Sequence, residues 1–192
     1  MFEGYGIKYN NKGSICFKGN FVEGKREGNG KCFSPDNGQL TYDGNFKDDK
    51  FDGLGVLNHA NGEPMYMGDF RDGVRNGQGK EYSIDGKMGY SGDFVNNNFE
   101  GIGVLYDDQE IKIYEGGFKI GVKSGNGLSY NDEQLVHKGA YKNDLYNGYG
   151  EAYGPKAKEF IGYYKDGQKS NGKILHTDGR KAVYYQGALV NE

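Results

Sequence analysis

The strongest constraint on the fold is a frame of aromatic residues and glycines that returns every 23 to 25 residues. One copy begins at Tyr66, has its second aromatic at Phe70, and ends with a glycine pair, Gly77 and Gly79. The leading aromatic position recurs at Phe17, Tyr42, Tyr66, Tyr90, Tyr114, His137 and Phe160. A repeat of this period indicates one supersecondary unit per copy, stacked along the chain.

The first half of each copy predicts a β-strand. Its leading aromatic, a glycine and the second aromatic are two residues apart, so they lie on one face of a strand, because strand side chains alternate. The residues between them are mostly polar, as at Asp43 and Asn45. This alternation favours a half-buried strand over a helix. The glycine leaves bare backbone over which neighbouring rings can lie.

Two tight turns are expected in each copy. Glycine, asparagine and aspartate tolerate the left-handed backbone that such turns need. One of these three stands seven residues after every leading aromatic, at Gly24, Asp49, Gly73, Asn97, Gly121, Asp144 and Gly167. Strong hairpin signals mark second turns at Asn37–Gly38, Asn61–Gly62, Asp85–Gly86 and Asp178–Gly179. Each copy therefore predicts strand, first turn, returning strand and second turn.

The pattern Y-x-G-x-F-x-x-G-x-x-x-G-x-G at this spacing resembles the MORN repeat, from about Gly4 to Leu189. The resemblance implies an all-β fold, a single elongated, twisted antiparallel sheet of tandem hairpins that is solenoid-like and has an open groove. We expect one array over 1–192. Its parts are a half-unit at 1–16, repeats starting near 17, 42, 66, 90, 114, 137 and 160, and a C-terminal half-unit at 184–192.

Three places depart from the regular pattern. His137 replaces a leading aromatic, and in the seventh copy Gly172 comes one residue late while Ile174 stands where the second glycine is expected. Packing is expected to be looser there. At the C-terminus, Tyr185 and Gly187 are interpreted as the outgoing half of a repeat without a returning strand.

Composition narrows the class of protein. Glycine accounts for 35 of 192 residues, and most of these stand in the repeat frame, which excludes a disordered low-complexity chain. The net charge of −3 and the lack of an extended basic run weigh against nucleic-acid binding. No long apolar stretch is present, so we expect neither a signal peptide nor a transmembrane segment, and a cytoplasmic location.

The cysteines and histidines predict no chemistry. Cys16 and Cys32 flank the first hairpin and face one another if its turn centres on Gly24; two reduced thiols are the favoured interpretation, and a disulfide is the alternative. The three histidines stand in different repeats, without metal-ligand spacing. The stretch 73–80 resembles a phosphate loop only superficially, because no helix is expected after it. We therefore expect no enzyme, metal or cofactor.

Candidate partner-binding residues follow the glycine pairs. Rings with a hydroxyl suit an interface that is apolar along its body and wet at its tip. Four such rings recur in the returning strands, and the C-terminal half-unit adds two further candidates. The set is Tyr82, Tyr106, Tyr130, Tyr153, Tyr185 and Leu189. The alternative for the four rings is a second packing row within the sheet.

Function is expected from the resemblance. MORN-repeat proteins act as adaptors, so the chain is expected to be a non-catalytic scaffold that binds protein partners, as peptide, helix or strand, through its groove and sheet edges. A cytoskeletal or ciliary assembly is the expected setting. Terminal strands are candidates for self-association, with frayed capping strands as the alternative. The runner-up function is a peripheral membrane tether for anionic phospholipid headgroups, which the interspersed charges support weakly.

Overall fold

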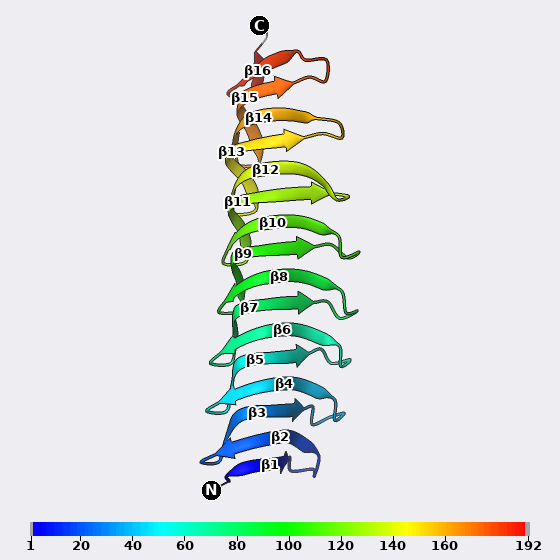
Figure 1. Cartoon of the computed structure of the whole chain (residues 1–192), viewed down its shortest axis with the longest axis vertical. Helices are drawn as coiled ribbons and strands as arrows, with labels where there is room; N and C mark the ends of the chain where they lie inside the picture. Colours follow the sequence, from blue (N-terminus) through cyan, green and yellow to red (C-terminus); the bar gives the residue numbers. More distant parts are fainter. Residues whose placement is uncertain (1, 191–192) are drawn as a thin grey trace. The chain divides into compact units, whose positions relative to one another are not determined.

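The computed structural model describes residues 2–190, which form seventeen β-strands and no helix. Figure 1 draws these strands in chain order. The described residues divide into two compact units, 2–98 (unit 1) and 99–190 (unit 2). Met1, Asn191 and Glu192, which belong to the expected terminal half-units, lie outside the described residues. Each unit is described by itself below.

Unit 1 contains eight strands. They are β1 (Gly4–Tyr9), β2 (Ile15–Val22), β3 (Lys25–Phe33), β4 (Leu40–Lys47), β5 (Lys50–Asn58), β6 (Pro64–Arg71), β7 (Val74–Tyr82) and β8 (Met88–Val95). The next strand, β9 (Asn98–Tyr106), begins at the unit boundary. Unit 2 continues with β10 (Lys112–Lys119), β11 (Val122–Asn131), β12 (Gln134–Lys142), β13 (Leu145–Tyr153), β14 (Lys158–Lys165), β15 (Gln168–Leu175), β16 (Lys181–Tyr185) and β17 (Ala188–Val190).

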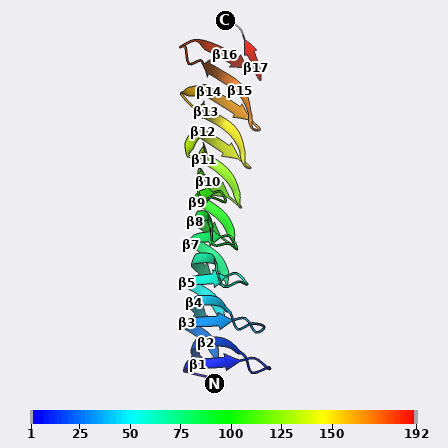
Figure 2. The same cartoon turned by 90° about the vertical axis from the view of Figure 1, so that its right-hand side faces the viewer.

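Within each unit, consecutive strands pair in antiparallel order. In the side view of Figure 2, each unit is one layer of strands, with no helix or second sheet over either face in the described part of the chain. The all-β class and the antiparallel sheet of tandem hairpins are therefore confirmed.

The first turns need a left-handed backbone at two successive residues. Between β4 and β5, Asp48 and Asp49 have φ angles of 48° and 69°. Two positive φ angles define the hairpin turn whose twist matches that of the flanking strands. This requirement explains why glycine, asparagine or aspartate stands at the second of these positions in every copy.

The two glycines of a pair have different tasks, as Gly53 and Gly55 illustrate. Gly53 has a φ of 95° and lies in a bulge, where the register of β5 against β4 shifts between the pairs at Gly44 and Phe46. Gly55 lies against the ring of Tyr42, and a Cβ there would overlap the tyrosine hydroxyl. One glycine therefore bends the strand, and the other admits the buried ring.

The seventh copy differs from the interpretation of its sequence. Gly172 pairs with Gly162, and a Cβ at Gly172 would lie 2.6 Å from the Phe160 ring. It therefore fills the position of the second, ring-packing glycine. The seventh copy has one residue fewer than the other copies between its first turn and this glycine, and the bulge of β15 is shorter by that residue. Ile174 is an ordinary strand residue opposite Phe160.

The C-terminal hairpin also differs from the expectation of an outgoing strand that begins at 184 and has no return. The outgoing strand β16 begins at Lys181, and β17 returns beside it. Gln186 and Gly187 have φ angles of 47° and 81°, so they form the first turn. Tyr184, whose ring centroid lies 6.2 Å from that of Phe160, takes the second aromatic position.

The two cysteines do not face one another. The register pairs Cys32 with Phe17, one residue from Cys16, and both thiols are free. The Cys16 thiol donates to the Lys8 carbonyl at 3.4 Å, whereas the Cys32 sulfur accepts from the Arg26 guanidinium at 3.4 Å. The two sulfurs thus have separate partners.

Candidate functional site

One face of each unit, called here the aromatic face, carries the leading and second aromatics. Within a unit, a leading ring meets the second aromatic of its own hairpin and that of the next hairpin of the same unit. Tyr66 lies 5.1 Å from Phe70 and 5.0 Å from Phe94, both edge to face. Such a contact contributes roughly 0.5–1.5 kcal/mol beyond area burial. The buried hydrophobic residues are Phe17, Phe21, Tyr42, Phe46, Tyr66, Phe70, Tyr90, Phe94, Tyr114, Phe118, Tyr141, Phe160 and Tyr164.

A leading tyrosine also fastens its own strand. The Tyr66 hydroxyl donates to the carbonyl of Asp69 at 3.0 Å, and the leading tyrosines of the neighbouring copies donate to the equivalent carbonyls. Burial raises the pKa of Tyr66 to about 12, so the hydroxyl stays protonated and keeps donating. The leading position therefore combines ring packing with one internal hydrogen bond.

The side chain that packs on each leading ring alternates between two types from one copy to the next. Sequence reasoning missed this alternation. Phe51 stacks on Tyr42 at 3.7 Å and 11°, whereas the Arg75 guanidinium lies 5.5 Å from the Tyr66 ring centroid. Both residues stand nine positions after a leading aromatic. That position reads Arg26, Phe51, Arg75, Phe99, Lys123, Tyr146 and Lys169, a strict alternation of cation and aromatic. Comparison of every second copy would have revealed it.

The cation also binds the first turn of the next copy. The Arg75 backbone N–H donates to the Asn97 side-chain oxygen at 2.9 Å, and its guanidinium donates to the Asn97 carbonyl at 2.9 Å. Backbone N–H groups of Arg26 and Lys123 make the same bond to Asp49 and Asp144. Among the seven copies, a first turn carries asparagine or aspartate where the preceding copy supplies such a cation, because its side-chain oxygen accepts this bond. The other first turns of these copies carry glycine.

A depression of about 470 Å³ lies on the aromatic face of unit 1. Rings and aliphatic side chains line one part of it, and an Arg75–Glu81 ion pair and a histidine line another. The His59 Nε2 atom lies 2.9 Å from the Tyr82 carbonyl. The lining residues include Phe51, Leu57, His59, Phe70, Arg75, Glu81 and Tyr82. The depression thus offers apolar surface beside fixed polar groups.

The four tyrosines predicted to bind partners are half-buried and lie on four different strands. They are Tyr82, Tyr106, Tyr130 and Tyr153. Lys112 Nζ lies 4.4 Å from the Tyr130 ring centroid, and Lys158 Nζ lies 5.5 Å from that of Tyr153. The Tyr153 hydroxyl donates to Glu151. Tyr82 lines the depression of unit 1, so the structure does not gather the four into one site.

The two C-terminal candidates flank the last turn. Tyr185 ends β16 and pairs with Ala188, while Leu189 pairs with Tyr184. Tyr185 is 55% exposed and Leu189 is 53% exposed. Their side chains are therefore open to solvent, on a hairpin separate from the other four candidates.

His137 is the one leading position in the matched frame without a benzene ring. It is 1% exposed, and neither ring nitrogen has a hydrogen-bond partner among residues 2–190. Tyr146 stacks on it at 3.7 Å, and Tyr164, whose hydroxyl also has no partner, meets it edge to face at 4.9 Å. Burial lowers the pKa of His137 to about 4, because charging the ring there would leave a cation without water. His137 is therefore a neutral packing ring.

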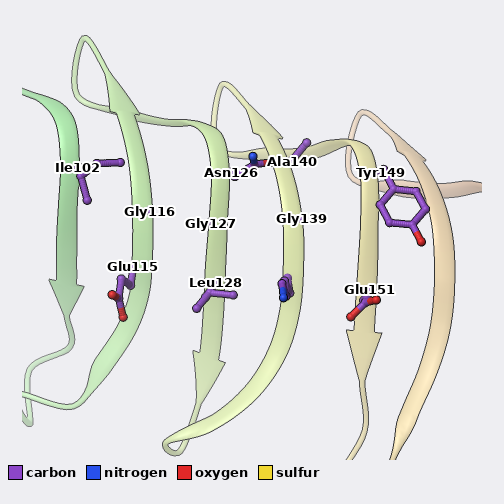
Figure 3. Close-up of a pocket in the computed structure, with 11 residues that line it drawn as sticks. Ile102, Glu115, Gly116, Asn126, Gly127, Leu128, Gly139, Ala140, Tyr149 and Glu151 are labelled. Atoms are coloured by element: carbon purple, nitrogen blue, oxygen red, sulfur yellow. The ribbon is translucent and has the colours of Figure 1, made fainter.

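The face opposite the aromatic face is called the reverse face. In unit 2 it carries a depression of about 680 Å³, with glycine backbone among its lining (Figure 3). Figure 3 shows its side chains in two rows across the strands. One row holds Ile102, Asn126, Ala140 and Tyr149, and the other holds Glu115, Leu128 and Glu151.

Glycine backbone and the small side chain of Ala140 form part of the lining of this depression. Gly117 and Ala140 stand three residues after their leading aromatics, where unit 1 carries Asn or Asp. A Cβ at Gly117 would overlap the Ser124 carbonyl, so no side chain fits there without a backbone shift. Ile102 and Tyr149 flank the gap and are 64% and 50% exposed. The reverse face of unit 2 therefore has a hollow beside exposed apolar side chains.

Groups suited to metal chemistry do not cluster in the described residues. Residues 2–190 contain no set of three or more His, Cys, Asp or Glu side chains placed to hold a metal ion. The same residues contain no helix long and apolar enough to cross a membrane. What the surface offers is apolar and aromatic area beside fixed polar groups, which is suited to binding.

The comparison with protein families identifies the repeat. The MORN repeat model matches residues 17–39, 42–63, 66–88, 90–109, 114–130 and 137–156, more than half of the chain. A search of curated proteins finds no significant match. MORN repeats typically occur in scaffold and membrane-binding proteins, and the family is generally non-catalytic. The chain belongs to the MORN-repeat family.

Proposed function

We propose that the protein is a non-catalytic scaffold that binds a segment of a protein partner on its aromatic face. The observation that carries the proposal is the depression of unit 1, where apolar side chains lie beside an ion pair and a histidine. Binding surfaces commonly combine apolar anchors with a few placed polar groups. No second layer covers this face in the described residues.

The chemistry of the depression defines the partner segment. Phe51 and Phe70, whose centroids are 5.6 Å apart, offer an apolar contact for one aliphatic or aromatic anchor. Glu81 and His59 offer hydrogen-bonding groups beside it. A peptide or an amphipathic helix with one apolar anchor and adjacent polar side chains matches this arrangement.

The alternative, a tether for anionic phospholipids, has weaker support. Such binding requires clustered, uncompensated Lys and Arg side chains. In the first turns of unit 1, Lys25 pairs with Asp48 at 2.6 Å and Lys50 pairs with Asp72 at 2.9 Å. These cations therefore already face carboxylates from the neighbouring turn, which favours the protein-binding proposal.

Two further parts of the proposal rest on the family and on the terminal hairpin. A cytoplasmic setting in a cytoskeletal or ciliary assembly is proposed from the family resemblance. The exposed Tyr185 and Leu189 side chains are proposed as contacts for an added strand, from a partner or a second copy. Replacing Leu189 with proline would remove a backbone donor from β17 and weaken such strand addition.

Selection from a displayed peptide library against the full chain tests the main proposal. We expect enriched peptides with one apolar anchor, and binding that falls about tenfold in Glu81→Lys, since a charge at the depression is reversed. Leu54→Asp on the reverse face of the same unit is the control and should bind as the wild type does. Selected peptides indifferent to Glu81→Lys, or no peptides together with cosedimentation on phosphoinositide vesicles, would contradict it.

A further inference from the structure

One row of side chains on the reverse face of unit 2 is complementary to itself. Cross-strand pairing connects one residue from each of eight successive strands, β9 to β16, and places them in a line. In order, they are Val104, Glu115, Leu128, Lys138, Glu151, Ile161, Lys173 and Val183. Counted outward from the midpoint of the row, the two residues at each step, one on either side, are either oppositely charged or both aliphatic.

The match is clearest for charge. Consider a second row laid over the first and rotated by a half turn about the midpoint, between β12 and β13. Lys138 of one row then meets Glu151 of the other, and Glu115 meets Lys173. The aliphatic residues meet one another in the same operation, Leu128 against Ile161. Neither Lys138 nor Lys173 forms an ion pair within the described residues, so both ammonium groups are available. The two carboxylates each lie 2.8 Å from a lysine of their own chain, Glu115 from Lys112 and Glu151 from Lys158, and would share it with the lysine of the second copy.

The second row, which runs beside the charged one, has small side chains on one side of the midpoint and large ones on the other. On one side of the midpoint lie Asn126 and Ala140, at the depression of about 680 Å³ (Figure 3). On the other side lie Tyr149 and Tyr163, 50% and 55% exposed, with ring centroids 5.6 Å apart. The same turn about the midpoint places the two tyrosines over the small residues.

We propose that a second copy of this chain docks on the reverse face of unit 2. The two-fold axis runs parallel to the strands, in the plane between two facing sheets, over the gap between β12 and β13. Each Lys138 then meets the partner's Glu151, and each tyrosine pair enters the partner's depression. An isologous contact of this kind needs one patch that is complementary to itself. This proposal is independent of the peptide-binding proposal, which concerns the other face of unit 1.

The patch is of a size that gives a reversible dimer. Six strands at a spacing of about 4.8 Å, each contributing about 20 Å of length, cover roughly 600 Å² per copy. The two copies together bury roughly 1,200 Å², at the lower end of specific interfaces. We therefore expect a dissociation constant on the order of 10 μM.

Sedimentation of the full chain tests the proposal first. Across concentrations from about one-tenth to ten times the expected dissociation constant, the wild type should pass from monomer to dimer. Lys138→Glu and Glu151→Lys, each alone, should weaken the dimer by at least about tenfold, since each sets two pairs of like charges against one another. Lys80→Glu, an exposed lysine on the reverse face of unit 1, should leave the dimer unchanged.

Mixing the two variants separates an intermolecular contact from an effect within one chain. Lys138 and Glu151 are also neighbours in the same sheet, so each variant alone disturbs both arrangements. In a mixed dimer, however, both intermolecular pairs join opposite charges again. We therefore expect an equal mixture to recover the mass and affinity of the wild-type dimer. Glu115→Lys mixed with Lys173→Glu is the second pair, should either first variant fail to fold.

Three results would overturn the proposal. The first is a wild type that stays monomeric throughout the concentration range. The second is a dimer that persists in both folded single variants, since association would then use another surface. The third is a pair of folded single variants that are monomeric and whose mixture stays monomeric, because the charges would then act within one chain.

Discussion

The reverse faces of the two units are built on the same hairpins but differ three residues after the leading aromatic. In unit 1 this position binds the sheet: Asn45 donates to the Leu54 carbonyl at 3.3 Å, and Asp69 accepts from the Gln78 N–H at 3.0 Å. In unit 2, Ala140 stands there and lines the depression, and Gly117 has no side chain to bind the sheet. The frame thus fixes the fold, and the positions between its members decide what the surface can bind.

The charged rows differ in the same way. In unit 1, the equivalent row contains Lys18, Lys31, Asp43, Val56 and Met67. A two-fold axis between β4 and β5 would set Asp43 against Val56 and Lys31 against Met67. Lys31 and Asp43 already pair with one another at 2.7 Å, and about this axis neither would meet an opposite charge on a second copy. The row of unit 1 is therefore not complementary to itself about this axis.

On the aromatic face, the comparison is between Tyr66 and His137. We expect Tyr66→Ala to lower the free energy of unfolding by about 3–5 kcal/mol, since it removes a fully buried ring and leaves a cavity. His137→Ala should cost less, because it also removes two buried nitrogens without partners. Urea unfolding measured on both variants checks this order. Equal losses would show that the two leading positions contribute alike.

Acid should weaken the hairpins around His137. Its pKa is about 4 in the fold and near 6.5 when the chain is unfolded, so protons bind the unfolded state more readily. Stability is therefore fully present above pH 6.5 and falls as the pH drops toward 4, by roughly 3 kcal/mol in all.

Unfolding midpoints measured from pH 7 to pH 4 test this, with His137→Phe as the matched control. The control should lose the part of the pH dependence that His137 contributes. Identical curves for the wild type and His137→Phe would show that His137 gains water or a partner in solution.

An acidic side chain at matched positions compares the two reverse faces. Tyr149 in unit 2 and Leu54 in unit 1 both stand between the glycines of a pair and are at least half exposed. Tyr149→Asp should weaken the dimer by at least about tenfold, because it places a charge in the partner's depression. Leu54→Asp should have no effect. Sedimentation measures the dissociation constant of the dimer for both variants. Equal dissociation constants would contradict the proposed difference between the two reverse faces.

Restoring the family residue at position 137 should give the smallest effect. Tyr114 donates to the Gly117 carbonyl at 3.0 Å, and His137→Tyr would place a hydroxyl near the equivalent carbonyl of Ala140. We expect a gain of about 1 kcal/mol from this bond and from the loss of the unpartnered nitrogens. Thermal unfolding measures it. A loss of stability would indicate that the Tyr164 hydroxyl leaves no room.

Most of the fold could be predicted because its determinants are local. The φ requirement at Asp49 and the ring contact at Gly55 each act within one hairpin, so each copy carries its own evidence. The seventh copy and the C-terminal hairpin were harder. Gly172 and Gly187 keep the residue type of the frame but change their position in it, and only the register shows which role each fills.

The surfaces could not be predicted because they depend on register between strands. Bulges shift which residues stand opposite each other, so the pairing of Lys138 with Glu151 cannot be read from their separation in sequence. The tyrosine rows show the same limit. Tyr82 lines a depression, whereas Tyr130 lies under a lysine, although both follow a glycine pair.

A distance across the proposed dimer tests the central claim most directly. A spin label at Gln109→Cys, with Cys16 and Cys32 replaced by serine, reports on the exposed turn between β9 and β10, outside the proposed contact. Turns six strand spacings apart, on sheets about 10 Å apart, place the two labelled backbone positions roughly 30 Å from one another. We predict an intermolecular distance of this size, abolished by Lys138→Glu. Absence of dipolar coupling between labels in the wild-type background would contradict the account.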